Sequence, residues 1–142
     1  MESSILQNEA NSLIELKKSN TLRIPQVIYD DNEFLILEYI QTGKKRTDFF
    51  EIFGCKLAKQ HQYTADKFGF FENNFIGDTK QINLPRIENW QEFYFQNRLM
   101  FQFKLAETNG YVSGKMRTLF SGLENKYDKI ILDDGEYPAL LH

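Results

Sequence analysis

The sequence predicts an α+β chain in which a short part with one helix and two strands precedes a mainly helical part. Three observations support this class. Apolar residues recur at helical spacing near the N-terminus, two short apolar runs then flank a polar turn, and helical periodicity returns over most of the rest. Strands and helices segregated in this way are typical of α+β proteins. We therefore expect one region at residues 1–42 and a second, mostly helical region at 43–142.

Composition and charge narrow the function classes. The 142 residues are 42% hydrophobic and 26% charged, as in globular proteins. The net charge of −3 provides no basic field, which argues against nucleic-acid binding. The longest apolar run is too short to span a bilayer, so we expect no membrane insertion. A single cysteine, Cys55, and no recognisable signal peptide predict a cytoplasmic protein without internal disulfides.

The N-terminal region begins with a helix predicted over residues 4–19. Ser4 and Gln7 have the spacing of a capping box. Glu9 falls inside the apolar face of this helix, so its carboxylate is either paired with a cation or located at the edge of the face, where it reaches water. The helical wheel alone slightly favours the edge position, because glutamate is rarely fully buried. The apolar face consists of Ile5, Leu6, Ala10, Leu13, Ile14 and Leu16.

A hairpin follows, with strands at 24–29 and 33–40 joined by a short polar turn. The uninterrupted apolar run 34–37 predicts a strand that is buried on both faces. The polar, glycine-containing stretch 41–45 predicts a hinge that leads out of the first region. At this strand end, residues 37–40 would expose backbone groups that can bind the flat edge of an adenine, although an ordinary strand end has the same sequence signal.

Helical periodicity returns in the second region. Asp133 and Asp134 end the last predicted helix, and a solvated helix end explains them better than a metal site. Residues 137–142 predict the beginning of another strand. The predicted helices span residues 47–61, with Thr47 as the N-cap, 89–108, and a last one that starts near Ser113, includes Tyr127 and ends before Asp133.

Residues 65–89 predict a long irregular loop, a feature that is often functional in compact domains. It includes Asn73, Asn74 and Gly77, which could form a binding loop or a plain turn; the turn is the simpler account. His61 lies on an apolar helix face without an adjacent nucleophile or metal ligand, so a core histidine is expected.

Several of these segments resemble the fructosamine (ketosamine) kinase family, whose protein-kinase-like fold is similar to that of aminoglycoside phosphotransferases and choline kinases. Residues 9–13 resemble the family's helix with an ion-pairing glutamate. The strands at 24–27 and 34–39 resemble those leading to the nucleotide hinge. The segment 57–61 resembles a Leu-Ala-x-Leu-His helix, with Gln60 in place of the second leucine.

The most specific similarity covers residues 68–83. The family has a comparable Phe-Gly, then Asn-Tyr-Ile-Gly, then Thr-x-Gln-x-Asn pattern, and this chain has Phe-Gly, Asn-Phe-Ile-Gly and Thr-Lys-Gln-Ile-Asn. Trp90 and Arg98 also fit the following helix of the family, where Arg98 by itself predicts an ion pair or stacking on an aromatic ring. Residues 138–142 resemble the approach to a catalytic loop. The resemblance thus covers nearly the whole chain.

The resemblance implies an incomplete protein-kinase-like (aminoglycoside phosphotransferase-like) fold, with the end of the N-terminal ATP-binding lobe at 1–42 and the first helices of the C-terminal lobe at 43–142. It implies ATP and Mg²⁺ as cofactors and a small-molecule or protein-bound ketosamine as the phosphate acceptor. Glu9 would orient a strand lysine. The adenine would meet Leu37, Glu38, Tyr39 and Ile40, and a substrate-side loop would contain Asn73, Asn74 and Gly77.

The chain also departs from the family pattern. The glycine-rich loop and strand lysine do not precede Glu9, and the catalytic Asp and metal-binding Asn would follow His142, which opens the catalytic loop. We therefore expect no catalytic or metal-binding residue in these 142 residues, no activity of the chain alone, and weak ATP binding. Apolar surface near Leu140 and Leu141 predicts self-association. The alternatives are a kinase of the same fold acting on aminoglycosides or choline-like acceptors, and a non-catalytic interaction module.

Overall fold

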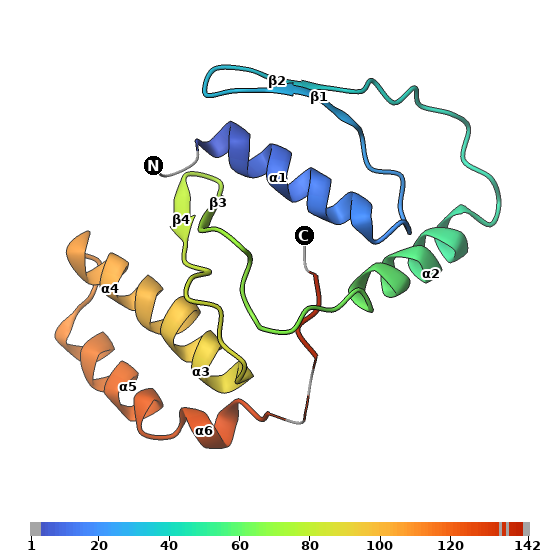
Figure 1. The fold of residues 1–142 in the computed structure, drawn as a ribbon. Coiled ribbons are helices and arrows are strands. Elements are labelled where there is room, and N and C mark those ends of the chain that lie inside the picture. The colour runs from blue at the N-terminus through green and yellow to red at the C-terminus, as the bar shows by residue number, and fades with distance from the viewer. Residues whose placement is uncertain (1–3, 134, 136, 141–142) are drawn as a thin grey trace. The chain divides into compact units, whose positions relative to one another are not determined.

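The computed structural model describes residues 4–133, 135 and 137–140, and the chain divides into two compact units. The first unit comprises Met1–Ala65 and Ala139–His142, and the second comprises Asp66–Pro138. Figure 1 shows the order of the helices and strands along the chain. The predicted lobe boundary at residue 42 concerns the complete kinase fold and stays a prediction.

The first element is helix α1, Ile5–Lys18, which confirms the helix predicted at 4–19. The capping box is present: Ser4 Oγ accepts from the Gln7 N–H, and Gln7 Oε1 accepts from the Ser4 N–H, each at 3.2 Å. Two orphan N–H groups of the first turn are thereby satisfied. Lys17 and Lys18 lie in the last turn, where cations interact favourably with the helix dipole.

The predicted hairpin is present but shorter than expected. Strand β1, Val27–Asp30, pairs antiparallel with β2, Leu35–Leu37. Asp31 closes the turn, because its Oδ1 accepts from the N–H groups of Glu33 and Phe34 at 2.7 Å each. The bond from the Glu33 N–H, together with those from Tyr29 and Phe34, holds the pKa of Asp31 below its usual value.

The prediction that residues 34–37 are buried on both faces was wrong. Phe34 and Ile36 are 60% and 50% exposed, whereas Leu35 and Leu37 are half-buried. Successive residues of a strand point to opposite faces, and α1 packs on these two strands. The pattern of exposure therefore shows a sheet with one covered face and one uncovered face.

Residues 38–48 form no helix or strand, as the predicted hinge requires, and helix α2 spans Phe49–His61. Its N-cap is Asp48 and not the predicted Thr47. The Asp48 carboxylate binds the Arg46 guanidinium through bonds of 2.9 and 3.0 Å instead of capping the helix. The strand predicted at 137–142 is reduced to one antiparallel bridge between Thr64 and Ala139, and residues 141–142 lie outside the described residues.

The second unit begins with a segment that is more regular than predicted. Within 65–89, strands β3 (Asn74–Ile76) and β4 (Thr79–Gln81) form an antiparallel hairpin. Its two central turn residues are Gly77, with a φ of +57°, and Asp78. Glycine at the first central position matches a type II′ turn, whose twist suits a two-residue hairpin. A short strand on either side of a turn glycine is a weak sequence signal, which explains the error.

The helical part of the second unit also differs in detail from its prediction. The helix predicted at 89–108 consists of α3 (Trp90–Tyr94), the π-helical turn η1 (Phe95–Met100) and α4 (Phe101–Thr108). The helix predicted from Ser113 to the break at Asp133 is divided into α5 (Gly114–Glu124) and α6 (Tyr127–Ile130). Stacked rings join these helices: Phe103 on Phe120 and Phe95 on Tyr127, with centroids 3.8 and 4.3 Å apart.

Gln60 generates a prediction for stability. This α2 residue is 2% exposed, and its Oε1 atom has no hydrogen-bond partner among the described residues. A buried carbonyl without a partner costs about 1–3 kcal/mol, and leucine fits a helix equally well. We expect Gln60→Leu to raise the free energy of unfolding by about that amount, measured by urea denaturation.

Gln62→Leu is the matched control, because Gln62 follows the same helix and is exposed. Its effect should stay within about 0.5 kcal/mol. A Gln60→Leu variant that is less stable than the parent chain would show that the Gln60 amide has a favourable role.

Candidate functional site

The hinge side of the candidate site begins at Glu38, directly after β2. Glu38 Oε1 accepts from Arg23 Nη2 at 2.8 Å, and Oε2 accepts from the Gln26 N–H at 3.1 Å. The Glu38 N–H in turn donates to the Gln26 carbonyl at 2.8 Å. The bond from Arg23, followed by that from Gln26, lowers the pKa of the Glu38 carboxyl. Glu38 therefore links the segment that follows β2 to the segment that precedes β1.

The backbone that remains available at the hinge has the chemistry of an adenine site. Among the described residues, no group bonds to the Glu38 carbonyl or to the Ile40 N–H. An adenine edge presents an amine that donates and a ring nitrogen that accepts, so one carbonyl and one N–H complement it. Leu37 is half-buried, whereas the Tyr39 side chain is 83% exposed. The residues present fit the group, and adenine contact at Leu37, Glu38, Tyr39 and Ile40 stays a prediction.

Glu9 lies one helical turn before Leu13 on α1. Leu13 and Val27 line the same cavity, and residues four apart share a helix face. Glu9 itself is exposed and forms no ion pair with a described residue. Its exposure matches the alternative in which the carboxylate reaches water, and its pairing with a strand lysine stays a prediction.

The second unit contains a buried polar network centred on Asn83, which is 2% exposed. The Asn83 N–H donates to Asn73 Oδ1 at 2.8 Å. Its Nδ2 donates to Asn74 Oδ1 and to the Glu72 carbonyl, at 2.8 and 2.9 Å. Its Oδ1 accepts from Arg98 Nη2 at 2.8 Å. One side chain thus connects the start of the β3–β4 hairpin, its end and the π-helical turn η1.

Arg98 anchors this network from η1. Its guanidinium donates to the Ile82 and Asn97 carbonyls and lies over the Phe93 ring, 4.6 Å from the centroid. Burial lowers the pKa of Arg98. The predicted aromatic stacking is confirmed. Positions where a helix widens to a π-turn often occur at functional sites, and here the turn carries the arginine that reaches the hairpin.

Gly69 allows the chain to approach Asn83 closely. Its φ is +103°, and a Cβ atom built there would lie 2.4 Å from the Asn83 carbonyl oxygen. Any other residue would strain the backbone and displace the network. The Phe-Gly pair of the motif therefore has a specific geometric reason: Phe68 packs against Trp90 while Gly69 lies against Asn83.

Asn73 and Asn74 use their carbonyl oxygens inside this network, so they position the hairpin. Asn73 Oδ1 also accepts from the Leu84 N–H at 3.0 Å. Gly77 lies at the exposed tip beside Ile76, which is 64% exposed. Asn73 and Asn74 thus stabilise the hairpin through hydrogen bonds within the protein. Contact of these two residues and Gly77 with a substrate stays a prediction.

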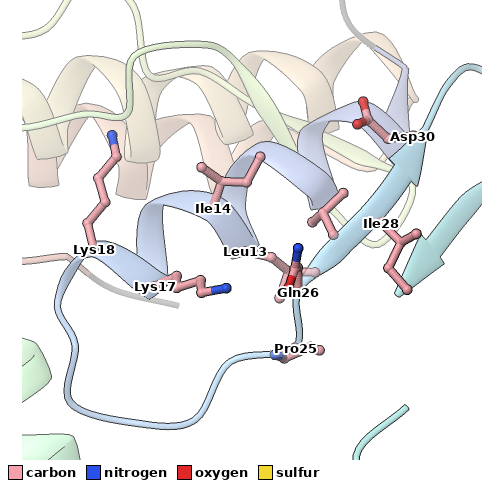
Figure 2. Close-up of a pocket in the computed structure, with 9 residues that line it drawn as sticks. Leu13, Ile14, Lys17, Lys18, Pro25, Gln26, Ile28 and Asp30 are labelled. Carbon is pink, nitrogen blue, oxygen red and sulfur yellow. The ribbon is translucent and has the colours of Figure 1, made fainter. Parts of the chain in front are cut away.

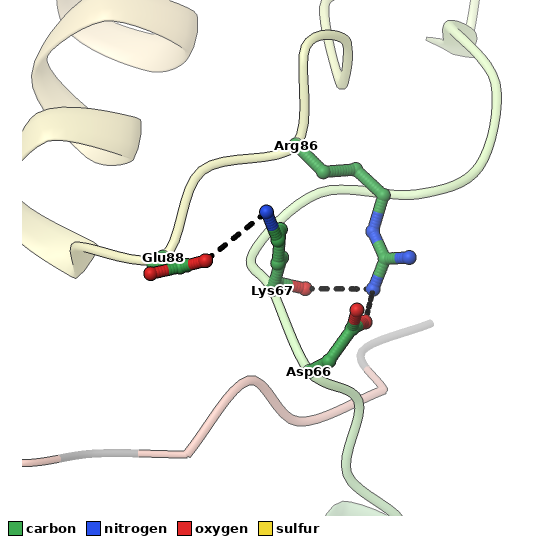
Figure 3. A network of polar contacts seen from close by, with 4 residues as sticks. All are labelled: Asp66, Lys67, Arg86 and Glu88. Atoms are coloured by element: carbon green, nitrogen blue, oxygen red, sulfur yellow. Dashed lines mark hydrogen bonds and ion pairs between the residues drawn. The ribbon is translucent and has the colours of Figure 1, made fainter.

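A polar cluster that the sequence did not indicate holds the two ends of this segment together (Figure 3). Arg86 binds Asp66 at 2.5 Å, and Lys67 binds Glu88 at 3.1 Å. Between these pairs, Phe68 and Ile87 exchange backbone hydrogen bonds. The partners lie about twenty residues apart along the chain, so no local pattern reveals them.

The remaining candidates have structural explanations or lie outside the described residues. Asp133 accepts a hydrogen bond from the Asn89 side chain at 2.8 Å, while Asp134 and His142 are not described. His61 is half-buried on α2. The described residues include no group of three or more metal-ligating side chains and no helix that is long and apolar enough to cross a membrane.

Comparison with known proteins decides the family. A sequence model of the family described as fructosamine kinase matches residues 1–142. The chain belongs to the fructosamine kinase family. The expectation from the quoted motifs is thereby confirmed, and the mixed helix and strand architecture agrees with the predicted α+β class.

Relatives of the family cover almost the whole chain. It is 30% identical to a chloroplastic protein-ribulosamine 3-kinase from Arabidopsis thaliana over 98% of this chain and 44% of the relative. It is also 30% identical to a probable ketoamine kinase from Pasteurella multocida, over 98% of this chain and 49% of the relative. The crystal structure of a candidate fructosamine-3-kinase from Thermobifida fusca superposes with a TM-score of 0.80 at 28% identity, covering 95% of this chain and 46% of the other. The chain spans about half the length of the curated relatives it matches.

The ion pair at the hinge generates a pH prediction. Because the folded pKa of Glu38 is lowered, the stability that its contacts contribute is present above the ordinary glutamate pKa of about 4.3 and is lost as the pH falls through the folded pKa. We expect a Glu38 NMR titration midpoint below that of a model glutamate, and a midpoint that rises toward it in Arg23→Gln. Arg46→Gln should leave the midpoint unchanged, because Arg46 binds Asp48. A midpoint insensitive to Arg23 would contradict the assigned cause.

The Asn83 network generates a second prediction. Asn83→Ala removes the acceptor of Arg98 and the donor to Asn74, and it leaves both groups poorly solvated. We expect the free energy of unfolding to fall by at least about 2 kcal/mol, with faster amide exchange in β3 and β4. Asn125→Ala is the matched control, since the Asn125 amide donates to Ser121 at an exposed helix end. Equal losses for the two variants would show that the network adds nothing specific.

Proposed function

We propose that this chain forms part of an ATP-dependent ketoamine kinase, in which the β1–β2 hairpin and the hinge bind the nucleotide and the β3–β4 hairpin lies on the acceptor side. The observation that carries the proposal is the fructosamine kinase match over residues 1–142. The Glu38 carbonyl and the Ile40 N–H, which have no hydrogen-bond partner in the part of the chain that the structure describes, support the nucleotide assignment because they complement an adenine edge. In this scheme Leu37 lines the back of the adenine pocket and Glu9 orients a lysine.

In the complete enzyme ATP would supply the γ-phosphoryl group, and a bound Mg²⁺ would stabilise the charge that develops on it. The acceptor's sugar hydroxyl forms the new bond to phosphorus, ADP leaves, and the hydroxyl proton passes to a base. Catalysis of this step depends on positioning and on charge stabilisation. By resemblance, the phosphate-binding loop, the base and the metal ligands belong before Glu9 and after His142. We therefore propose that the 142-residue chain alone has no phosphotransferase activity.

The acceptor class follows from the relatives. The curated relatives are named as ribulosamine and ketoamine kinases, which supports a sugar–amine adduct over an aminoglycoside or a choline-like acceptor. A cytoplasmic location stays part of the proposal, although the plant relative is chloroplastic. A second candidate function is a non-catalytic interaction module. The large exposed apolar side chains Phe34, Tyr39 and Phe50 favour this second candidate.

ADP binding separates the two candidates. We expect an NMR titration of the chain with ADP to show weak, saturable shifts at residues 37–40. Ile40→Pro removes the backbone donor and should weaken ADP binding about fivefold, the value of one hydrogen bond. Gln41→Pro adds the same ring one residue later and is the control. The chain should release no ADP from Mg-ATP in the presence of a fructose–lysine adduct.

The outcomes are distinct. Shifts confined to the hinge, with loss in Ile40→Pro only, support the nucleotide site. No shift at any ADP concentration favours the interaction module. Turnover in the usual kinase range, on the order of 1–100 per second, would show that the catalytic groups lie within this chain and that the assignment by resemblance is wrong.

A further inference from the structure

A cavity of about 380 Å³ lies between α1 and β1 in the first unit (Figure 2). Its walls are largely apolar and accessible: Ile14 and Ile28, which line it from the helix and the strand, are 47% and 63% exposed. Leu13 and Val27 form the inner wall and are half-buried. We call this surface the α1–β1 groove. Neither the adenine site nor the Asn83 network uses it.

The groove runs along an unpaired edge of the sheet. Residues 25–28 and Asp30 line it, from the segment that leads into β1 and from β1 itself. No residue of β2 lines it, so it lies on the side of β1 away from its partner strand. Both backbone groups of Gln26 face Glu38, and the pairing register shifts between Val27 and Tyr29, so β1 bulges where it lines the groove. Among the described residues, no strand pairs with this edge.

The two ends of the groove carry opposite charges. Lys17 and Lys18 lie at the end where β1 begins, and Asp30 lies at the end where β1 stops (Figure 2). Lys18 is paired with Glu15 at 2.6 Å, whereas Lys17 forms no ion pair with a described residue. Asp30 likewise forms none. The groove thus has one available cation at one end and one available anion at the other.

This arrangement is complementary to itself. A twofold axis brings the same surface of two molecules together, so that residue i meets residue j and residue j meets residue i. Two β1 strands that run antiparallel and centre near Ile28 would place Asp30 of each copy beside Gln26 of the other, at the end that carries Lys17. Both ion pairs form together, and Ile28 of the two copies meets at the centre.

We propose that the chain associates with a second copy of itself through the α1–β1 groove, with the two β1 strands antiparallel. The apolar walls supply the buried area, the unpaired edge supplies backbone hydrogen bonds, and Lys17 and Asp30 fix the orientation. An edge strand left open in this way is a general site of chain pairing. The proposal is independent of the kinase assignment, because it uses no residue of the hinge.

Sedimentation equilibrium of the purified 142-residue chain tests association directly. We expect a concentration-dependent monomer–dimer equilibrium in the parent chain. Ile28→Lys should shift it to monomer, because a charge would lie at the centre of the interface. Ile36→Lys is the matched control: the same change on the neighbouring strand, at a residue 50% exposed that does not line the groove. Circular dichroism establishes that both variants keep the parent fold.

Charge exchange tests the orientation. Asp30→Lys alone sets two lysines against each other at both ends, and Lys17→Asp alone does the same with two carboxylates, so each variant should be monomeric. The double variant Lys17→Asp/Asp30→Lys decides the orientation. Antiparallel copies of it again set opposite charges together at both ends, so it should dimerise with itself but not with the parent chain. A parallel pairing predicts the reverse, because residue 17 would then meet residue 17 and residue 30 would meet residue 30.

Each outcome decides the matter. A parent chain that is monomeric at all concentrations overturns the proposal. So does a dimer that survives Ile28→Lys but dissociates in Phe50→Lys, because the interface would then lie on α2. A dimer abolished by Ile28→Lys, with a double variant that pairs with the parent chain but not with itself, retains the groove but overturns the antiparallel orientation.

Discussion

The burial of the Asn83 side chain is the constraint on which the second unit depends. An amide with two donor hydrogens and one acceptor is costly to bury unless each finds a partner. Here the partners come from Asn74, the Glu72 carbonyl and Arg98, so they link the hairpin to the helix. Gly69 must lie against the same residue for the chain to close. Residues 68–83, the most specific family motif, therefore form one hydrogen-bonded network with Arg98 around Asn83, and the loss of any one contact would leave another buried polar group without its partner.

The first unit is held together differently. Its polar ties, such as Arg23–Glu38 and Arg46–Asp48, are exposed, and exposed ion pairs contribute little to stability. Its order rests on α1 packing against two short strands, and a two-stranded sheet is only marginally stable by itself. The same lack of cover leaves the hinge backbone and the β1 edge accessible. The proposed nucleotide site and the proposed contact with a second chain thus depend on the same physical feature of the first unit.

Local signals in the sequence predicted local structure well. Contacts between residues at most four apart in sequence determine these local features, so a short segment is enough to predict them. They are the capping box at Ser4, the turn at Asp31 and the helices α1 and α2. The two-sided burial of residues 34–37 failed because burial depends on what covers a sheet, and one face here is uncovered. The site was predicted only as residue types. The hydrogen bonds that join Asn83 to Asn73 and to Arg98 span 10 and 15 residues of the sequence. No local sequence pattern predicts them, so they are found only in the folded structure.

The internal use of the asparagine oxygens limits what this hairpin can do in a kinase. Asn73 and Asn74 accept hydrogen bonds through Oδ1, and their Nδ2 groups have no partner among the described residues. Under the proposed function, the Asn73 amide can therefore only donate toward a sugar hydroxyl oxygen, because its Oδ1 also accepts from Leu84, whereas Asn74 can donate and accept one further bond. A neutral amide oxygen is not a base. A donor can orient an acceptor molecule but cannot take the hydroxyl proton, which requires a base. The β3–β4 hairpin thus fits a role in holding the acceptor, and the proton must pass to a group outside this network.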